Sequence, residues 1–149
     1  MRLWHKDLIK YLPRQQLLGQ WRECCAIAGN IVKRGSPNHI LVNKIDKFDI
    51  IDFLAYTKLV KTEMINRGYK ISQKADEKFC CNIEEVYGGL MLITRLPKKD
   101  EIFNNEFFQW HNDRYLKQCL FNLQEKYDCG GILEDEWKVI ENHFDEYLD

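Results

Sequence analysis

The stretch "PRQQLLGQWRECCAIAGN" (residues 13–30) decides the fold, because its apolar side chains recur with the period of an α-helix. Proline suits the first turn of a helix, where its missing N–H costs no hydrogen bond. The apolar positions run from Leu17 to Ile27, and Gly29-Asn30 is a typical capping or kinking pair. These signals predict an amphipathic helix over residues 13–30.

Working outward, the same periodicity predicts further helices over 49–67 (stopped by Gly68), 79–86, 107–127 (closed by Gly130-Gly131) and 133–148, the last one acidic. Residues 33–39 ("KRGSPNH") predict a basic loop. Residues 88–97 ("GGLMLITRLP") are either a short extended segment, near 88–96, or a buried helical turn, since periodicity does not separate the two in short apolar runs. We expect a mainly α fold, a compact bundle of four to five helices.

Length and composition bound the class of protein. The chain has 149 residues, 45% hydrophobic and 30% charged, with no repeat or linker, so we expect one domain over residues 1–149. No apolar run approaches the roughly 18 residues needed to span a bilayer. Charges at Arg2, Lys6 and Asp7 argue against a signal peptide. We therefore expect a cytoplasmic protein with reduced cysteines.

The charge is unevenly distributed. Residues 1–50 carry nine Lys/Arg against four Asp/Glu, residues 51–100 nine against seven, and residues 101–149 four against twelve, within a net charge of −1. A basic front and an acidic end are typical of a polyanion-binding face with an acidic element turned away from it. The alternative is that the two halves attract each other, and composition does not decide between them.

Two cysteine pairs, Cys24-Cys25 and Cys80-Cys81, raise the question of a metal site. Structural zinc sites prefer ligands two to four residues apart, whereas adjacent positions on a helix point about 100° apart. We therefore expect buried free thiols and no metal site. The four histidines are scattered along the chain without ligand spacing.

The polar side of the first helix carries the strongest functional candidates. Arg14, Gln15, Arg22 and Glu23 lie there, and the basic residues 33–34 follow. Arginine and glutamine are side chains that reach phosphates and base edges of nucleic acids. A plain solvated helix face explains the same spacing, so spacing alone leaves both interpretations open.

A resemblance to a known family rests on residues in a fixed order. They are Arg2 directly after the start residue, "QQL" at 15–17, "RE" at 22–23, Gly29 and Lys33. The segment "FDIIDFLAYTKLVKTEMINRGYKI" (48–71) and, more weakly, "HNDRYLKQCLFNLQEK" (111–126) extend it over about two thirds of the chain. The sequence resembles the phage-type pyrimidine-dimer DNA glycosylases with AP lyase activity (endonuclease V of the pyrimidine-dimer type), and in particular a bacterial subgroup.

The resemblance implies a mechanism and a partner. The nucleophile would be the α-amine of Met1, with Glu23 the essential carboxylate, and no metal or cofactor would take part. Damaged double-stranded DNA would be bound by Arg2, Arg14, Gln15, Arg22, Lys33 and Arg34. We expect a monomer, associated with the nucleoid of a bacterium. His5 and Trp4, close to the proposed nucleophile, either line its pocket or pack the N-terminus, and we favour packing.

The chain also departs from the family pattern. Arg2 is too large for removal of the start methionine, so Met1 would present its own α-amine. Gln16 and Ala26 stand where the family has histidine and arginine, and Phe121 and Glu125 stand near its late cationic positions. Fewer cations weaken DNA binding. The resemblance therefore predicts the type of reaction better than it predicts which damaged base the protein recognises. The alternative function is a non-catalytic module of the same fold that binds nucleic acid or protein.

Overall fold

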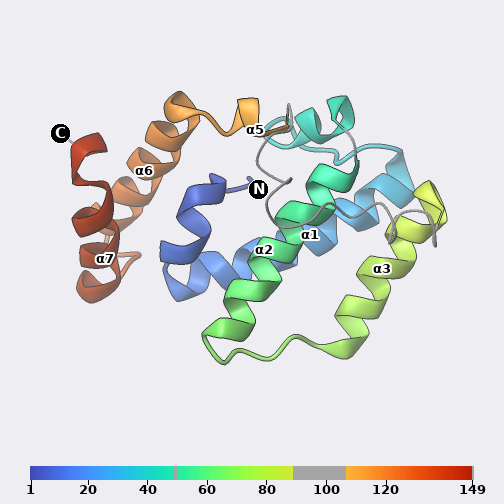
Figure 1. The fold of residues 1–149 in the computed structure, drawn as a ribbon, viewed down its shortest axis with the longest axis horizontal. Coiled ribbons are helices and arrows are strands. Elements are labelled where there is room, and N and C mark those ends of the chain that lie inside the picture. Colours follow the sequence, from blue (N-terminus) through green and yellow to red (C-terminus); the bar gives the residue numbers. More distant parts are fainter. Residues whose placement is uncertain (49, 89–106, 149) are drawn as a thin grey trace.

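The computed structural model describes residues 1–48, 50–88 and 107–148, and all the regular elements in these ranges are helical (Figure 1). In chain order they are η1 (Lys6–Tyr11), α1 (Arg14–Arg34), η2 (Asn43–Lys47), α2 (Ile50–Asn66), α3 (Gln73–Tyr87), α5 (Phe107–Trp110), α6 (Asp113–Asp128), α7 (Glu134–Phe144) and η4 (Asp145–Tyr147). The mainly α prediction is confirmed, with five of these helices longer than two turns. The extended segment expected near 88–96 lies outside the described residues, apart from Gly88.

Helix α1 is longer than the sequence predicted. It continues through Gly29-Asn30 to Arg34, and Gly35, at φ 74°, caps it by donating its N–H to the Ile31 carbonyl at 2.9 Å. A glycine inside a helix costs about 1 kcal/mol relative to alanine. Burial of Ile27, Ala28 and Ile31 against the rest of the core outweighs that cost. The expected cap at residues 29–30 is therefore wrong, and Lys33 and Arg34 lie in the last helical turn instead of in a loop.

Helix α2 lies where the sequence placed it and ends at Asn66, two residues before Gly68, which has a φ of 82°. Helix α3 begins six residues earlier than expected, at Gln73. Its N-cap is Ser72, whose hydroxyl accepts a hydrogen bond from the Ala75 N–H at 3.3 Å. The apolar stripe at Phe79 and Ile83 marks only the middle of this helix, which is why its first turn escaped prediction.

The helix expected over 107–127 is two helices. Helix α5 ends at Trp110, and α6 starts at Asp113 with Asn112 as its N-cap, accepting from the Tyr115 N–H at 3.0 Å. The break occurs because His111 is buried, where its Nδ1 accepts a hydrogen bond from the Lys6 N–H at 2.9 Å. The acidic segment 133–148 also splits, into α7 and the short η4.

Helix α1 runs through the middle of the molecule, in contact with α2 and α3 (Figure 1). Helices α6 and α7 pair at one end of the view, α3 lies at the other, and the N-terminus lies between them. Among the described helices, none is long and apolar enough to cross a membrane. The arrangement places the first residues of the chain at the centre of the helical assembly.

The cysteines are free, but their environments differ. Cys24 and Cys119 are buried, Cys25 is half-buried, and Cys80 and Cys81 are exposed, so the expected burial holds in full only for Cys24 in the first pair and is wrong for the second pair. Helix α3 buries Phe79 and Ile83, which are four residues apart on one face. The two positions that follow Phe79 point away from that face.

Candidate active site and DNA-binding surface

The first five residues form no helix, and a side-chain amide from α1 holds their backbone. The buried Gln20 donates from Nε2 to the Arg2 carbonyl at 2.9 Å, and its Oε1 accepts from the Trp4 N–H at 2.7 Å. One amide thus binds the backbone groups on both sides of Leu3, as a neighbouring β-strand would. The N-terminal segment is fixed in register against α1.

Two tyrosines hold the same segment from other helices. The Tyr56 hydroxyl on α2 donates to the Trp4 carbonyl at 2.6 Å and lies 2.9 Å from Gln20 Oε1. The Tyr115 hydroxyl on α6 donates to the Leu3 carbonyl. Burial raises the pKa of both tyrosines, so both hydroxyls keep the protons they donate. Three helices therefore position the start of the chain.

The carboxylate of Glu23 lies next to this segment. Its Oε2 accepts from the Arg2 backbone N–H at 3.2 Å and from Gln20 Nε2 at 3.3 Å, and the side chain is half-buried. The α-nitrogen of Met1 is only three bonds from the Arg2 nitrogen. The structure thus brings together Met1 and Glu23, the two residues predicted to be catalytic.

Two histidines that the sequence showed as scattered are in contact. The His5 and His111 ring centroids are 5.3 Å apart, and His5 Nε2 lies 2.8 Å from the His111 carbonyl, to which it donates when protonated. His5 Nδ1 accepts from the Asp7 N–H at 3.1 Å. Burial lowers the pKa of both rings, that of His111 to about 2. Both therefore serve as neutral hydrogen-bonding groups that fix the chain where it leaves the N-terminal segment.

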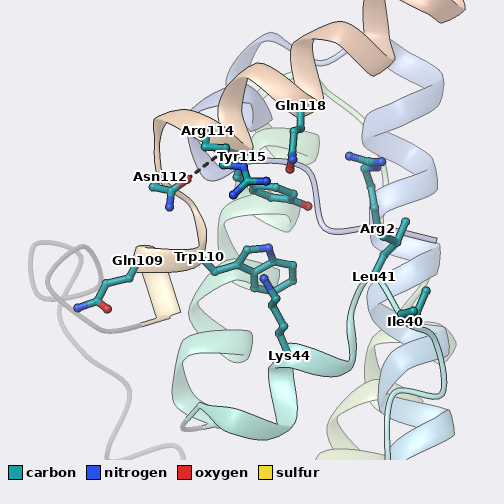
Figure 2. Close-up of a pocket in the computed structure, with 10 residues that line it drawn as sticks. All are labelled: Arg2, Ile40, Leu41, Lys44, Gln109, Trp110, Asn112, Arg114, Tyr115 and Gln118. Carbon is teal, nitrogen blue, oxygen red and sulfur yellow. Dashed lines mark hydrogen bonds between the residues drawn. The ribbon is translucent and has the colours of Figure 1, made fainter.

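The Arg2 side chain points into a cavity of about 610 Å³ (Figure 2). Arg2 and Lys44 approach it from the N-terminal half of the chain, while Trp110, Arg114 and Tyr115 line its other side. Lys44 Nζ lies 5.7 Å from the Trp110 ring centroid, and the Arg2 guanidinium lies 5.3 Å from that of Trp4. Three cations and no carboxylate are found among the described residues that line the cavity. It is therefore electropositive and partly aromatic.

Sequence reasoning missed most of this cavity. Lys44, Trp110 and Arg114 come from η2, α5 and α6, and none of them belongs to a contiguous basic segment that would have indicated a binding site. The only signal was the segment 111–126, which contains Arg114 without marking it as a DNA contact. Gln20 was missed for another reason: a single polar side chain on an apolar helix face carries no pattern of its own.

The other predicted DNA-binding residues are spread along α1. Helical spacing places Gln15, Arg22 and Lys33 on one stripe, and all three side chains are exposed. Lys33 also lines a second cavity, of about 350 Å³, between α1 and α3. Arg22 directly precedes Glu23 in the sequence, so the stripe lies about 100° around the helix axis from that carboxylate.

Arg14 and Arg34 lie at the two ends of α1, about 30 Å apart along its axis. The Arg14 guanidinium lies 5.7 Å from the Tyr69 ring centroid. The backbone N–H of Arg14 donates to the Glu136 carboxylate at 2.6 Å. An acidic residue of α7 thus binds the N-terminus of the basic helix, where a negative charge is favourable. This contact agrees with attraction between the two halves of the chain.

In the part of the chain that the structure describes, no three His, Cys, Asp or Glu side chains are grouped so that they would hold a metal ion.

Comparison with known proteins gives one result. A family model described as pyrimidine dimer DNA glycosylase matches residues 1–77, slightly more than half of the chain. No curated protein and no solved structure matches significantly. The matched range contains Met1, Glu23, Gln20, Tyr56 and Lys44, and ends in the first turns of α3. The chain therefore belongs to the pyrimidine dimer DNA glycosylase family.

Proposed function

We propose that the protein is a DNA repair N-glycosylase with AP lyase activity, in which the Met1 α-amine is the nucleophile and Glu23 the assisting carboxylate. The observation that carries the proposal is the 3.2 Å contact between Glu23 Oε2 and the Arg2 N–H, at the start of a chain that three helices hold in place. Its substrate class is damaged duplex DNA with a pyrimidine-dimer-like lesion. Family membership supports this substrate class.

The reaction follows from amine chemistry. An α-amine titrates near pH 8, well below a lysine, so a useful fraction is uncharged at neutral pH. Its nitrogen attacks the sugar C1′, and the base leaves with the electrons of the glycosidic bond and gains a proton. The nitrogen loses a proton, and its lone pair then opens the C1′–O4′ bond. O4′ takes the electrons of that bond and the second proton of the nitrogen, which leaves an imine between Met1 and the sugar.

Strand cleavage is the second half of the reaction. Loss of a C2′ proton expels the 3′ phosphate, which takes the electrons of the C3′–O bond, and water then hydrolyses the imine. A carboxylate beside the amine stabilises the cationic sugar and moves protons in these steps. Glu23 would be this carboxylate, because its Oε2 contacts the Arg2 N–H, next to the α-amine.

Positioning is the contribution of the fold. The amine belongs to the most flexible part of an ordinary chain, yet here side chains bind the backbone of residues 2, 3 and 4. A nucleophile held in place before the substrate arrives avoids much of the entropic cost of the reaction. This arrangement supports a catalytic role for the start of the chain more strongly than a role in DNA binding alone.

The DNA contacts follow the same geometry. Arg2 and Arg22 would bind phosphates close to the lesion, with Gln15 and Lys33 extending the contact along α1, and Arg14 and Arg34 at its ends. We propose that the protein acts as a monomer without metal or cofactor, in the cytoplasm. A non-catalytic binding module remains the second candidate, favoured by the exposed Phe121 and Glu125 on α6 near the positions where the family carries cations.

The test uses Glu23→Gln, which keeps the shape and removes the charge, with Glu85→Gln on the exposed face of α3 as the matched control. The substrates are duplexes that carry one cyclobutane dimer or one abasic site. We expect Glu23→Gln to lose at least about 100-fold in strand cleavage while keeping its melting temperature and DNA binding, and Glu85→Gln to cleave like the wild type. Cleavage retained in Glu23→Gln would refute the role of Glu23. A wild type that binds both duplexes but cleaves neither would favour the binding module.

A further inference from the structure

Two apolar side chains, Ile40 and Leu41, project from the turn between α1 and η2 at the edge of the Arg2 cavity (Figure 2). Ile40 is 84% exposed and Leu41 46% exposed. Full burial of a large aliphatic side chain stabilises a folded protein by about 1.5–3 kcal/mol, and exposed side chains lack this stabilisation. A pair of them beside a functional cavity therefore calls for an explanation, and we call it the 40–41 tip.

The turn that carries the tip is firmly held. The His39 N–H donates to Asn43 Oδ1 at 2.9 Å, and the Leu41 N–H donates to His39 Nδ1 at 3.2 Å. The Val42 N–H donates to the His39 carbonyl at 3.0 Å, and Val42 is fully buried. The two apolar side chains are thus presented on a rigid base.

The surroundings of the tip indicate what it contacts. The described residues that share its cavity include the cations Arg2, Lys44 and Arg114 and no carboxylate. Three cations that line one cavity do not complement a membrane interior or an apolar protein groove, whereas they do complement the negative charges of a polyanion. An apolar element at the edge of a cavity lined by phosphate-binding groups matches one feature of duplex DNA, its base stack between two charged backbones.

We propose that the 40–41 tip is a wedge that enters the base stack of duplex DNA, while Arg2, Lys44 and Arg114 bind the flanking phosphates. The inference rests on the proposed function, since it takes DNA as the ligand. Apolar wedges unstack a base step and kink the duplex. Attack at C1′ needs the damaged nucleotide partly out of the stack. Arg2, next to the proposed nucleophile, shares the cavity with the tip, so the wedge would act beside the reacting sugar.

The test is the double variant Ile40→Ser/Leu41→Ser, with Ile65→Ser/Val86→Ser as a matched control that removes two exposed aliphatic side chains elsewhere. Unstacking is measured as 2-aminopurine fluorescence beside a tetrahydrofuran abasic analogue, which the enzyme cannot cleave. Chemistry is measured separately by cleavage of a natural abasic site in duplex and in single-stranded DNA. The single variant Ile40→Ser, at the more exposed position, guards against a folding defect.

We expect the wild type and the control to raise the fluorescence severalfold and the double variant to lose most of that increase. Cleavage by the double variant falls about tenfold on the duplex and stays unchanged on the single strand, where there is no stack to open. A double variant that matches the wild type in fluorescence and duplex cleavage overturns the wedge, as does a wild type that binds and cleaves without a fluorescence change. A wild type that neither binds the duplex nor cleaves the single strand overturns the proposed function itself.

Discussion

At the scale of single residues, Gln20 is the side chain on which the position of the N-terminus depends. It bonds Arg2, Trp4 and Glu23 at once, and the Tyr56 hydroxyl lies 2.9 Å from its Oε1. Gln20→Leu keeps most of the volume but leaves a buried N–H and a buried carbonyl without partners. Each such group costs about 1–3 kcal/mol, so we expect a loss of about 2–6 kcal/mol in the free energy of unfolding, measured by urea denaturation.

The control for this variant is Gln73→Leu, on the exposed start of α3, which we expect to change stability by less than about 0.5 kcal/mol. Gln20→Leu also displaces the α-amine, so its yield of imine should fall at saturating DNA. Equal stability and equal imine yield in wild type and Gln20→Leu would contradict the positioning role.

His111 makes a second prediction at this scale. Its pKa is lowered by burial to about 2, so the unfolded chain, with a histidine pKa near 6.5, binds the extra proton between these values. Stability from this group is complete above pH 6.5 and declines as pH falls through that window, by up to about 1.4 kcal/mol per pH unit. His111→Asn keeps an acceptor for the Lys6 N–H and does not titrate there.

We therefore expect the free energy of unfolding of the wild type to fall more steeply between pH 6.5 and 4 than that of His111→Asn, whatever their difference at pH 7. The measurement is urea denaturation at half-unit pH steps. Parallel pH profiles for the two proteins would show that the buried ring does not control acid stability.

At the scale of elements, Arg67 joins two parts of the chain that flank the site. From the end of α2 it donates to the Leu12 carbonyl at 2.7 Å and the Lys10 carbonyl at 3.0 Å, at the end of η1, while its Nε donates to Glu63 at 2.8 Å. Arg67→Met keeps the aliphatic stem and leaves these carbonyls without this donor. We expect a loss of about 1–3 kcal/mol in unfolding free energy.

The matched control is Lys58→Met on the exposed side of α2, for which the expected change lies within about 0.5 kcal/mol. Hydrogen exchange adds the location: the amides of η1 should lose protection in Arg67→Met and keep it in the control. Unchanged protection in η1 would mean that the arginine does not anchor it.

The elements also show what sequence reasoning reached. Helices α1 and α2 were predicted because each contains a long segment in which apolar residues recur with helical spacing. The end of α1 and the break at His111 were not, because packing of Ile31 and hydrogen bonding of His111 to Lys6 decide them, and both depend on residues far away in the chain. The start of α3 depends on a Ser72 cap that stands outside the apolar pattern.

At the scale of the whole molecule, the layout of charge predicts the salt dependence of DNA binding. The net charge is −1, yet Arg2, Lys44 and Arg114 converge on one cavity and Arg22 lies on the exposed stripe of α1. With Arg14, Lys33 and Arg34, our proposal places seven cations on phosphates, so log K should fall with log salt at a slope of about −6.3. Lys44→Gln/Arg114→Gln should reduce the slope to about −4.5, as measured by fluorescence anisotropy over a salt series.

Lys138→Gln is the control, because Lys138 lies on the acidic helix α7 and pairs with Glu134 at 3.3 Å. We expect it to leave the slope unchanged. An equal reduction in the control and in the double variant would mean that binding follows net charge rather than the cavity.

Only the part of the site whose residues are close together in the sequence could be predicted. Met1 and Glu23 lie within the first helix and its approach, where order and spacing carry the resemblance. The cavity joins Lys44 to Trp110 and Arg114, more than sixty residues later, and only the folded chain brings them together. The roles of Met1, Glu23 and the DNA-binding residues stay predictions until they are measured.

The most direct measurement is borohydride trapping of the untagged protein on a duplex with one abasic site, followed by mass mapping of the adduct. We expect a covalent protein–DNA adduct at Met1, which is lost when the α-amine is blocked by acetylation or by an N-terminal tag. An adduct at a lysine, or none from a protein whose free amino terminus has been verified, would contradict the claim that the start of the chain is the nucleophile.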